Sequence, residues 1–143
     1  MSKQYATAIC LMTVNVTSLG LCLAGLLLNM GWYRFLLGIF ILPLLALHFG
    51  LHARIALEKK RIRQTTILYS CLSQVAIAIA FILFPDVSDA PGSRYAVFGL
   101  YQQPPDFFST IALCGLLGAF VLTFMTLLTT RKRRTKRRLP AER

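Results

Sequence analysis

The sequence predicts an all-α fold, a polytopic membrane protein in which four transmembrane helices form a bundle and both chain ends lie in the cytoplasm. Of its 143 residues, 56% are hydrophobic and only 15% are charged, which is unusual for a soluble domain. The basic residues stand in short blocks between long apolar runs. We therefore expect a helical transmembrane domain over residues 1–130 and a basic cytoplasmic tail over residues 131–143.

Four runs of the sequence are long and apolar enough to cross a bilayer, because a hydrocarbon core of about 30 Å needs roughly 20 residues at 1.5 Å each. Backbone amides in lipid must be hydrogen-bonded within their own segment, so each run is expected to be helical. Pro43 should bend the second helix. The first run exceeds the core of a signal peptide, about 7–15 residues, and is expected to be retained. The expected spans are residues 6–28, 35–53, 66–84 and 107–129.

Basic residues determine the expected orientation, because cytoplasmic loops of membrane proteins carry an excess of Lys and Arg. Five basic residues and one acid, Glu58, lie between the second and third runs, and residues 131–138 after the fourth run hold seven more basic residues. We expect both blocks at the cytoplasmic lipid headgroups, where they attract anionic lipids. These residues are Arg54, Lys59, Lys60, Arg61, Arg63, Arg131, Lys132, Arg133, Arg134, Lys136, Arg137 and Arg138.

The segment between the third and fourth runs, residues 85–106, is expected to be a periplasmic loop. It holds three of the five acidic residues and is rich in proline and glycine. Such turn-forming residues indicate a short cap tethered over the helix ends. Its aromatic residues Tyr95, Phe98 and Tyr101 are expected in the membrane interface, where aromatic rings are favoured.

Small and polar residues recur every three or four positions in the first run and form two adjacent stripes, a pattern that favours close helix contact. The fourth run contains a similar stripe. We expect spans one and four to pack closely, and a polar pore lining is the alternative interpretation. The residues expected in this contact are Thr17, Gly20, Ala24, Gly115 and Ala119, and the second stripe of the first run comprises Asn15, Ser18, Cys22, Gly25 and Asn29.

Two amide side chains, Asn15 and Gln74, are predicted at similar depths, roughly 12–14 Å from the cytoplasmic side at 1.5 Å per residue. They are close enough in depth to meet. A hydrogen bond between them would contribute only about 0.6–2 kcal/mol. It would therefore hold the register of two helices without indicating catalysis.

His48 and His52, the only histidines, are four residues apart and share a helix face near the cytoplasmic end of the second run. A metal site would need further ligands, yet no run contains Asp or Glu. A haem with two histidine ligands needs them on opposite sides of its ring, which one helix does not supply. The remaining interpretations are a proton-sensitive contact, because histidine titrates near neutral pH, and a structural role. In the structural role His48 bonds to a neighbouring helix and His52 lies among the headgroups.

No constellation typical of an enzyme, a cofactor site or a nucleic-acid interface is present. Intramembrane proteases need buried carboxylates or a Ser–His pair. The small multidrug exporters share this size and plan but depend on a glutamate in the first span, where Asn15 is the most polar residue here. The basic tail has no aromatic residue to stack on bases. The cysteines lie inside apolar runs without a CxxC pair, so neither disulfides nor zinc are expected: Cys10, Cys22, Cys71 and Cys114.

One family resemblance covers mainly the second half of the chain. The basic segment 59–63 runs into Leu68-Tyr69 and Gln74, and the following loop holds Pro91-Gly92, Arg94, Phe98, Pro105 and Asp106. With a gap in the loop, this pattern resembles the small four-span YbjO-like inner-membrane proteins of enterobacteria. That family has no established activity, so the resemblance implies only a bacterial inner (plasma) membrane as the location.

The leading functional interpretation is a non-enzymatic accessory or regulatory inner-membrane protein that acts through contact with another membrane protein or with a second copy of itself. One alternative is a small oligomeric transporter, flippase subunit or channel. A further alternative is an immunity or membrane-permeabilising protein of the phage or bacteriocin type, suggested by the small size and the charged tail.

Overall fold

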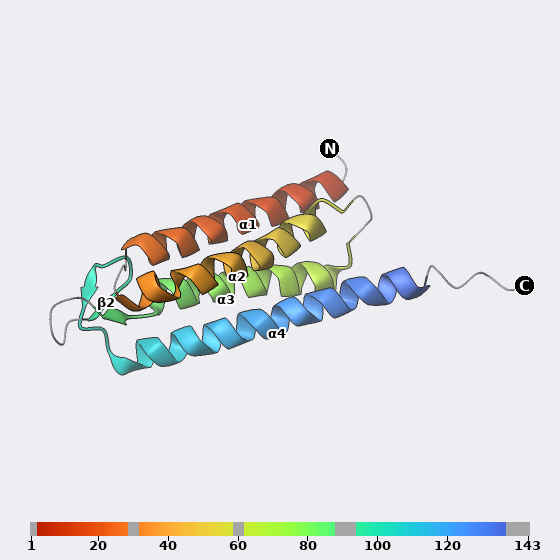
Figure 1. The fold of residues 1–143 in the computed structure, drawn as a ribbon. Helices are drawn as coiled ribbons and strands as arrows, with labels where there is room; N and C mark the ends of the chain where they lie inside the picture. Colours follow the sequence, from red (N-terminus) through yellow and green to blue (C-terminus); the bar gives the residue numbers. More distant parts are fainter. Residues whose placement is uncertain (1–2, 29–31, 59–61, 88–93, 137–143) are drawn as a thin grey trace, which may run out of the picture.

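The computed structural model describes residues 3–28, 32–58, 62–87 and 94–136. Within these ranges the chain forms four α-helices, α1 (Lys3–Leu28), α2 (Trp32–Ala56), α3 (Gln64–Leu83) and α4 (Asp106–Lys136) (Figure 1). Each helix contains a stretch that is long and apolar enough to cross a membrane: Gln4–Leu28, Ile39–Ala56, Gln64–Leu83 and Asp106–Thr130. The predicted all-α fold with four membrane-spanning helices is therefore confirmed at the level of length and composition.

Successive helices run in opposite directions, so the start of α1 and the end of α4 lie at one end of the molecule (Figure 1). We call this the N/C end. The segment between α3 and α4 lies at the opposite end, which we call the sheet end. α4 continues to Lys136, so the first six residues of the expected tail extend this helix.

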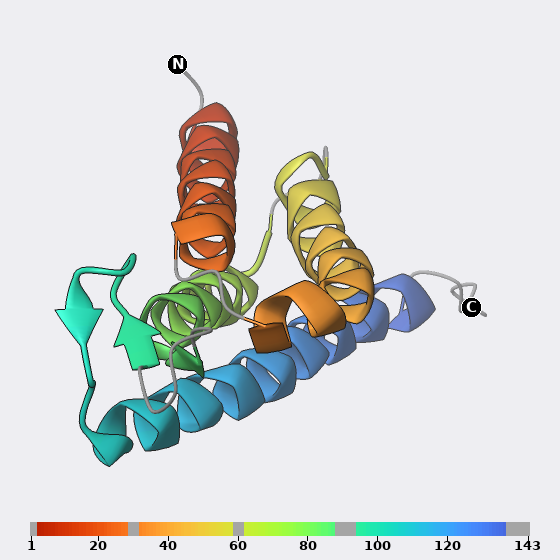
Figure 2. The same ribbon diagram turned by 60° about the vertical axis from the view of Figure 1, so that its left-hand side comes forward.

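α3 is the central helix and packs against both α1 and α4, while α1 also packs against α2 (Figure 2). Small residues allow two of these contacts to be close. A Cβ atom on Gly25 of α1 would lie 2.8 Å from the carbonyl oxygen of Phe81, and one on Gly115 of α4 would lie 2.9 Å from that of Ala76. The backbones of α1 and α4 thus each approach the backbone of α3.

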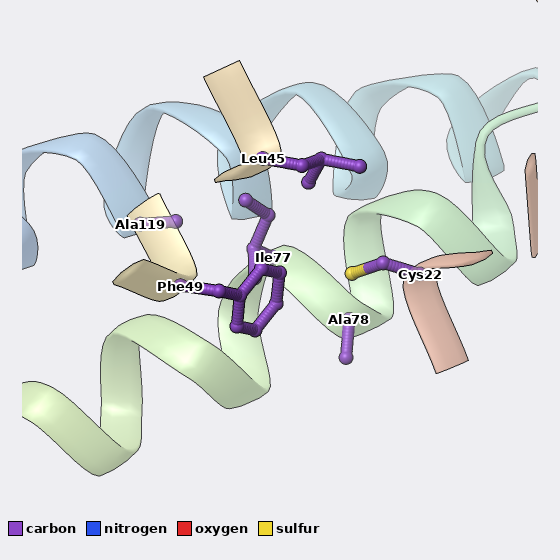
Figure 3. Packing of buried hydrophobic residues seen from close by; sticks show 6 residues of the cluster. All are labelled: Cys22, Leu45, Phe49, Ile77, Ala78 and Ala119. Atoms are coloured by element: carbon purple, nitrogen blue, oxygen red, sulfur yellow. The ribbon is translucent and has the colours of Figure 1, made fainter. Parts of the chain in front are cut away.

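The apolar core is small and receives side chains from all four helices (Figure 3). Phe49 of α2 packs near Ile77 of α3. Many of the large apolar side chains, such as Phe40 of α2 and Val121 of α4, are exposed instead, as expected for a surface that contacts lipid. The buried cluster comprises Cys22, Leu45, Phe49, Ile77, Ala78 and Ala119.

Pro43 lies inside α2. In Figure 2 the first turns of this helix run at an angle to the remainder. A proline removes one backbone hydrogen bond and bends a helix in this way. The bend agrees with the prediction from the sequence.

A three-stranded antiparallel sheet, β1 (Asp86–Val87), β2 (Arg94–Ala96) and β3 (Tyr101–Gln102), covers the helices at the sheet end. The sequence predicted only turns here, because strands of two or three residues are too short to show an alternating pattern. Val97, Phe98 and Gly99 make the turn after β2 with positive φ angles of 53°, 59° and 77°. The backbone N–H of Val97 donates to the carbonyl oxygen of Ile82, which ties the sheet to the end of α3.

Candidate functional site

A network of buried polar side chains connects α2, α3 and α4 near the N/C end. Its centre is His52, which is only 1% exposed. One ring nitrogen, Nδ1, lies 2.7 Å from Ser70 Oγ on α3, and the other, Nε2, lies 3.3 Å from Thr123 Oγ1 on α4. His52 therefore bridges two helices, and its contacts are with protein side chains.

Thr123 is the branching point of the network. Its hydroxyl lies 3.2 Å from His48 Nδ1, 2.7 Å from Ser73 Oγ and 2.8 Å from the carbonyl oxygen of Ala119. Ser73 also donates to the same carbonyl oxygen at 2.8 Å. A hydroxyl has one proton to donate and two lone pairs, so these contacts are not all satisfied by Thr123 as the donor.

Several arrangements of protons fit these distances, because Thr123 can also donate to the carbonyl oxygen of Ala119. Two of them run in opposite directions through the network. In the first, Ser73 donates to Ala119, Thr123 donates to Ser73, and N–H groups of both histidines donate to Thr123. Ser70 then donates to Nδ1 of His52. In the second, Ser73 donates to Thr123, which donates to Nε2 of His52, while Nδ1–H of His52 donates to Ser70. The direction of these hydrogen bonds therefore reverses when the hydroxyls rotate and His52 changes tautomer, and no helix has to move.

Asn15 and Gln74 are both buried, but the hydrogen bond that their similar depth allowed is not formed. Asn15 donates through Nδ2 to the carbonyl oxygen of Phe49 at 3.3 Å, and Gln74 donates through Nε2 to Ser70 Oγ at 3.3 Å. The side-chain oxygens of both amides have no hydrogen-bond partner among the described residues. Asn15 turns toward α2, whereas Gln74 reaches back one turn along its own helix.

The network occupies only one half of the bundle. A separate hydrogen bond of 3.0 Å between Thr66 and Thr129 lies closer to the N/C end. Toward the sheet end, the buried side chains described in the helices are small or apolar, among them Leu26, Ala80 and Ala112. The polar groups therefore do not cross the bundle within the described residues.

All members of the network are neutral donors or acceptors, apart from the two imidazoles. Both ring nitrogens of His52 already have hydroxyl partners. His48 Nε2 is buried without a partner among the described residues, which also contain no group of three or more His, Cys, Asp or Glu side chains that could hold a metal ion. The chemistry available here is hydrogen bonding and the exchange of protons between neutral groups.

The expected contact between spans one and four is wrong, because within the described residues α3 separates α1 from α4 (Figure 2). Thr17 and Gly20 are exposed, and a Cβ on Gly20 would have nothing within 4 Å. Ala24 is half-buried. Gly115 does make a close contact, but with Ala76 of α3, and Ala119 is buried in the core to which all four helices contribute.

The second stripe of α1 faces the bundle instead. Asn15, Ser18, Cys22 and Gly25 are all buried. Both stripes have the same spacing of three and four residues, so the spacing gave no reason to prefer either. The orientation of α1 depends on its partners, Phe81 on α3 and Phe49 on α2.

Sequence reasoning missed the hydroxyl partners of the histidines. Ser70 and Ser73, with Gln74, occupy one face of α3 at spacings of three and four residues. This polar face was the available signal, because a helix face with several polar residues inside a membrane usually contacts protein rather than lipid. Thr123 follows Ala119 by four residues and so belongs to the stripe of small and polar residues in the fourth run, which indicated helix packing alone.

The basic residues predicted at the headgroups are described only in part. Arg54 near the end of α2 and Arg63 before α3 are exposed at the N/C end. Arg131, Lys132, Arg133, Arg134 and Lys136 continue the backbone of α4. Lys59, Lys60, Arg61, Arg137 and Arg138 lie outside the described residues.

No family model, curated protein or solved structure matches this chain. The resemblance to the YbjO-like proteins stays a prediction. What can be said of the site therefore depends on its own residues.

Proposed function

We propose that this protein is a non-enzymatic accessory or regulatory protein of the bacterial inner membrane, with both chain ends in the cytoplasm, that acts by lateral contact with another membrane protein. The observation that supports this proposal is the outer face of α1. Cys10, Thr13, Thr17 and Gly20 are exposed there at helical spacing. The opposite face of the same helix is already occupied by α2 and α3.

The outer face of α1 differs from an ordinary lipid-facing surface in two respects. Its residues are small, which allows another helix backbone to approach closely. Its hydroxyls are also unsatisfied, because Thr13 and Thr17 make no hydrogen bond to any described residue, whereas Thr123, Thr126 and Thr130 of α4 donate to carbonyl oxygens of their own helix. A polar group at this depth gains most when a protein helix covers it.

The test is site-specific photocrosslinking in intact membranes, with a benzophenone side chain at Thr17. The matched control is the same side chain at Leu117, which is exposed on α4. Thr17 lies 13 residues from Gln4 and Leu117 lies 13 residues from Thr130, so both occupy the same depth in their spans. A discrete protein adduct at Thr17 that is absent at Leu117 is expected.

Gly20→Leu should abolish this adduct without lowering the stability of the chain, since its Cβ meets no other atom within 4 Å. Gly118→Leu, equally unobstructed but on α4, should leave the adduct intact. An adduct of twice the chain mass would identify a second copy as the partner. Lipid adducts alone, at both positions, would exclude the proposal.

A small oligomeric transporter is the second candidate, and the buried network of His52, Ser70 and Thr123 is the observation that favours it. Chains of hydroxyls and imidazoles can pass protons. The apolar half toward the sheet end opposes conduction by a single chain. Proton flux into liposomes that depends on His52 would favour this candidate, and liposomes that stay tight at every protein density would remove it.

A further inference from the structure

A groove of about 630 Å³ lies between the last turns of α2 and the C-terminal part of α4. This volume is in the range that small-molecule sites have. Gly50 and Leu51 line it on the α2 side, and Leu127 and Thr130 line it on the α4 side. Gly50 leaves room in the groove, because a Cβ on this residue would have nothing within 4 Å.

The groove changes in polarity along its length. Both helices run toward the N/C end here, so Gly50, Leu51 and Leu127 lie deeper in the span than Arg54 and Thr130. Arg54 is about 6 Å further toward the N/C end than Gly50, at 1.5 Å per residue. The deep part is apolar and the outer part offers a guanidinium and a hydroxyl. A phospholipid has the same order of groups along its length.

The basic residues near the groove favour a lipid with an anionic headgroup. Arg54 is exposed at the rim of the groove, where Glu58 is the single acidic residue. The sequence adds Lys59, Lys60 and Arg61 directly after this acid and seven basic residues directly after Thr130. Basic residues at the membrane surface attract anionic headgroups.

We infer that this groove binds one anionic glycerophospholipid, with an acyl chain along Gly50, Leu51 and Leu127 and the phosphate beside Arg54. A second copy of the chain is the alternative occupant, and the test below distinguishes it from a lipid. The inference is independent of the lateral contact on α1, which lies on a different helix.

The test uses the full-length protein, purified in mild detergent and stripped of lipid, with native mass spectrometry as the readout. Phosphatidylglycerol and phosphatidylcholine with identical acyl chains are added at equal concentrations. One phosphatidylglycerol molecule should be retained in preference to phosphatidylcholine. Arg54→Gln should weaken retention of phosphatidylglycerol about fivefold and leave phosphatidylcholine unchanged.

Gly50→Leu should fill the groove and weaken retention of phosphatidylglycerol at least tenfold. Leu127→Phe fills it from α4 and should act in the same way, so the test does not depend on one variant folding. Gly20→Leu is the control, because this glycine is exposed with nothing within 4 Å of an added Cβ but lies far from the groove on α1.

Three outcomes would overturn the inference. Equal retention of both lipids would remove the headgroup selection. Full retention of phosphatidylglycerol by Gly50→Leu and Leu127→Phe would place the lipid elsewhere. A dimer that both variants abolish would assign the groove to a second copy of the chain.

Discussion

His52 of α2 and Ser70 of α3 are joined by a hydrogen bond of 2.7 Å, although 18 residues separate them in the chain. Both side chains are at most 1% exposed. The bond joins two helices whose association gains little free energy from apolar contacts. Lipid tails are as apolar as the side chains, so separated helices are solvated equally well. Polar bonds of this kind are therefore expected to specify how α2 sits against α3.

A double-mutant cycle measures this bond. We expect His52→Leu to lower the free energy of unfolding by about 1–3 kcal/mol, because two hydrogen bonds are lost, and Ser70→Ala to lower it by about 0.6–2 kcal/mol. The double variant should lose less than the sum, by about 0.5–1.5 kcal/mol. Reversible unfolding in mixed micelles gives the three values.

The control pairs His52→Leu with Thr66→Ala. The hydroxyl of Thr66 bonds to Thr129 and shares no hydrogen-bond partner with His52. Their effects should add to within about 0.5 kcal/mol. If the losses from His52 and Ser70 add equally well, the 2.7 Å bond contributes nothing to stability.

The second prediction compares the effects on stability of alanine at Gly115 and at Gly118 of α4. A methyl group on Gly115 would meet the carbonyl oxygen of Ala76 at 2.9 Å, so Gly115→Ala must move α4 away from α3 and should cost about 1–3 kcal/mol. Gly118→Ala meets nothing within 4 Å and should leave stability unchanged or raise it slightly. Equal thermal midpoints for the two variants in detergent would refute the contact.

The same comparison on α1 distinguishes its two stripes. Gly25→Ala would place a methyl group 2.8 Å from the carbonyl oxygen of Phe81 and should destabilise the protein. Gly20→Ala should not, because the stripe that contains it faces outward. Loss of stability in Gly20→Ala alone would instead support the original expectation that this stripe packs inside the bundle.

The orientation in the membrane is a prediction from the charges. Fourteen of the sixteen basic residues are assigned to the cytoplasmic side by the block pattern. A reporter fused after Arg143 should read as cytoplasmic, and one inserted after Gly92 should read as periplasmic. A cytoplasmic signal from the Gly92 insertion would rule out four crossings in this orientation.

The basic segment after α4 makes the last prediction. Residues 131–138 hold seven positive charges, more than a topology signal needs. A peptide of residues 130–143 should bind anionic vesicles by about 1 kcal/mol per basic residue and lose that binding as salt rises. Equal binding to neutral vesicles, or binding that salt does not change, would leave the segment as a topology signal only.

The sequence by itself determined the number, approximate bounds and type of the membrane-spanning segments. The lipid solvent is the reason. It offers no hydrogen bonds, so a long apolar run can pair its backbone N–H and C=O groups only by forming a helix, whatever its neighbours are. The position of Pro43 also predicted a bend from local chemistry alone. The positions of Asn15 and Gln74 within the spans followed from the apolar runs around them. The small side chain of Gly115 indicated a close helix contact but not which helix it meets.

Only the tertiary structure decided which partners these residues meet. The two stripes of α1 have the same period, so choosing Gly25 over Gly20 required the position of Phe81 on α3. His52 contacts Ser70 on α3 and Thr123 on α4, which are 18 and 71 residues away from it in the sequence. A periodic pattern indicates which residues share one face of a helix. It does not indicate which face of another helix packs against them.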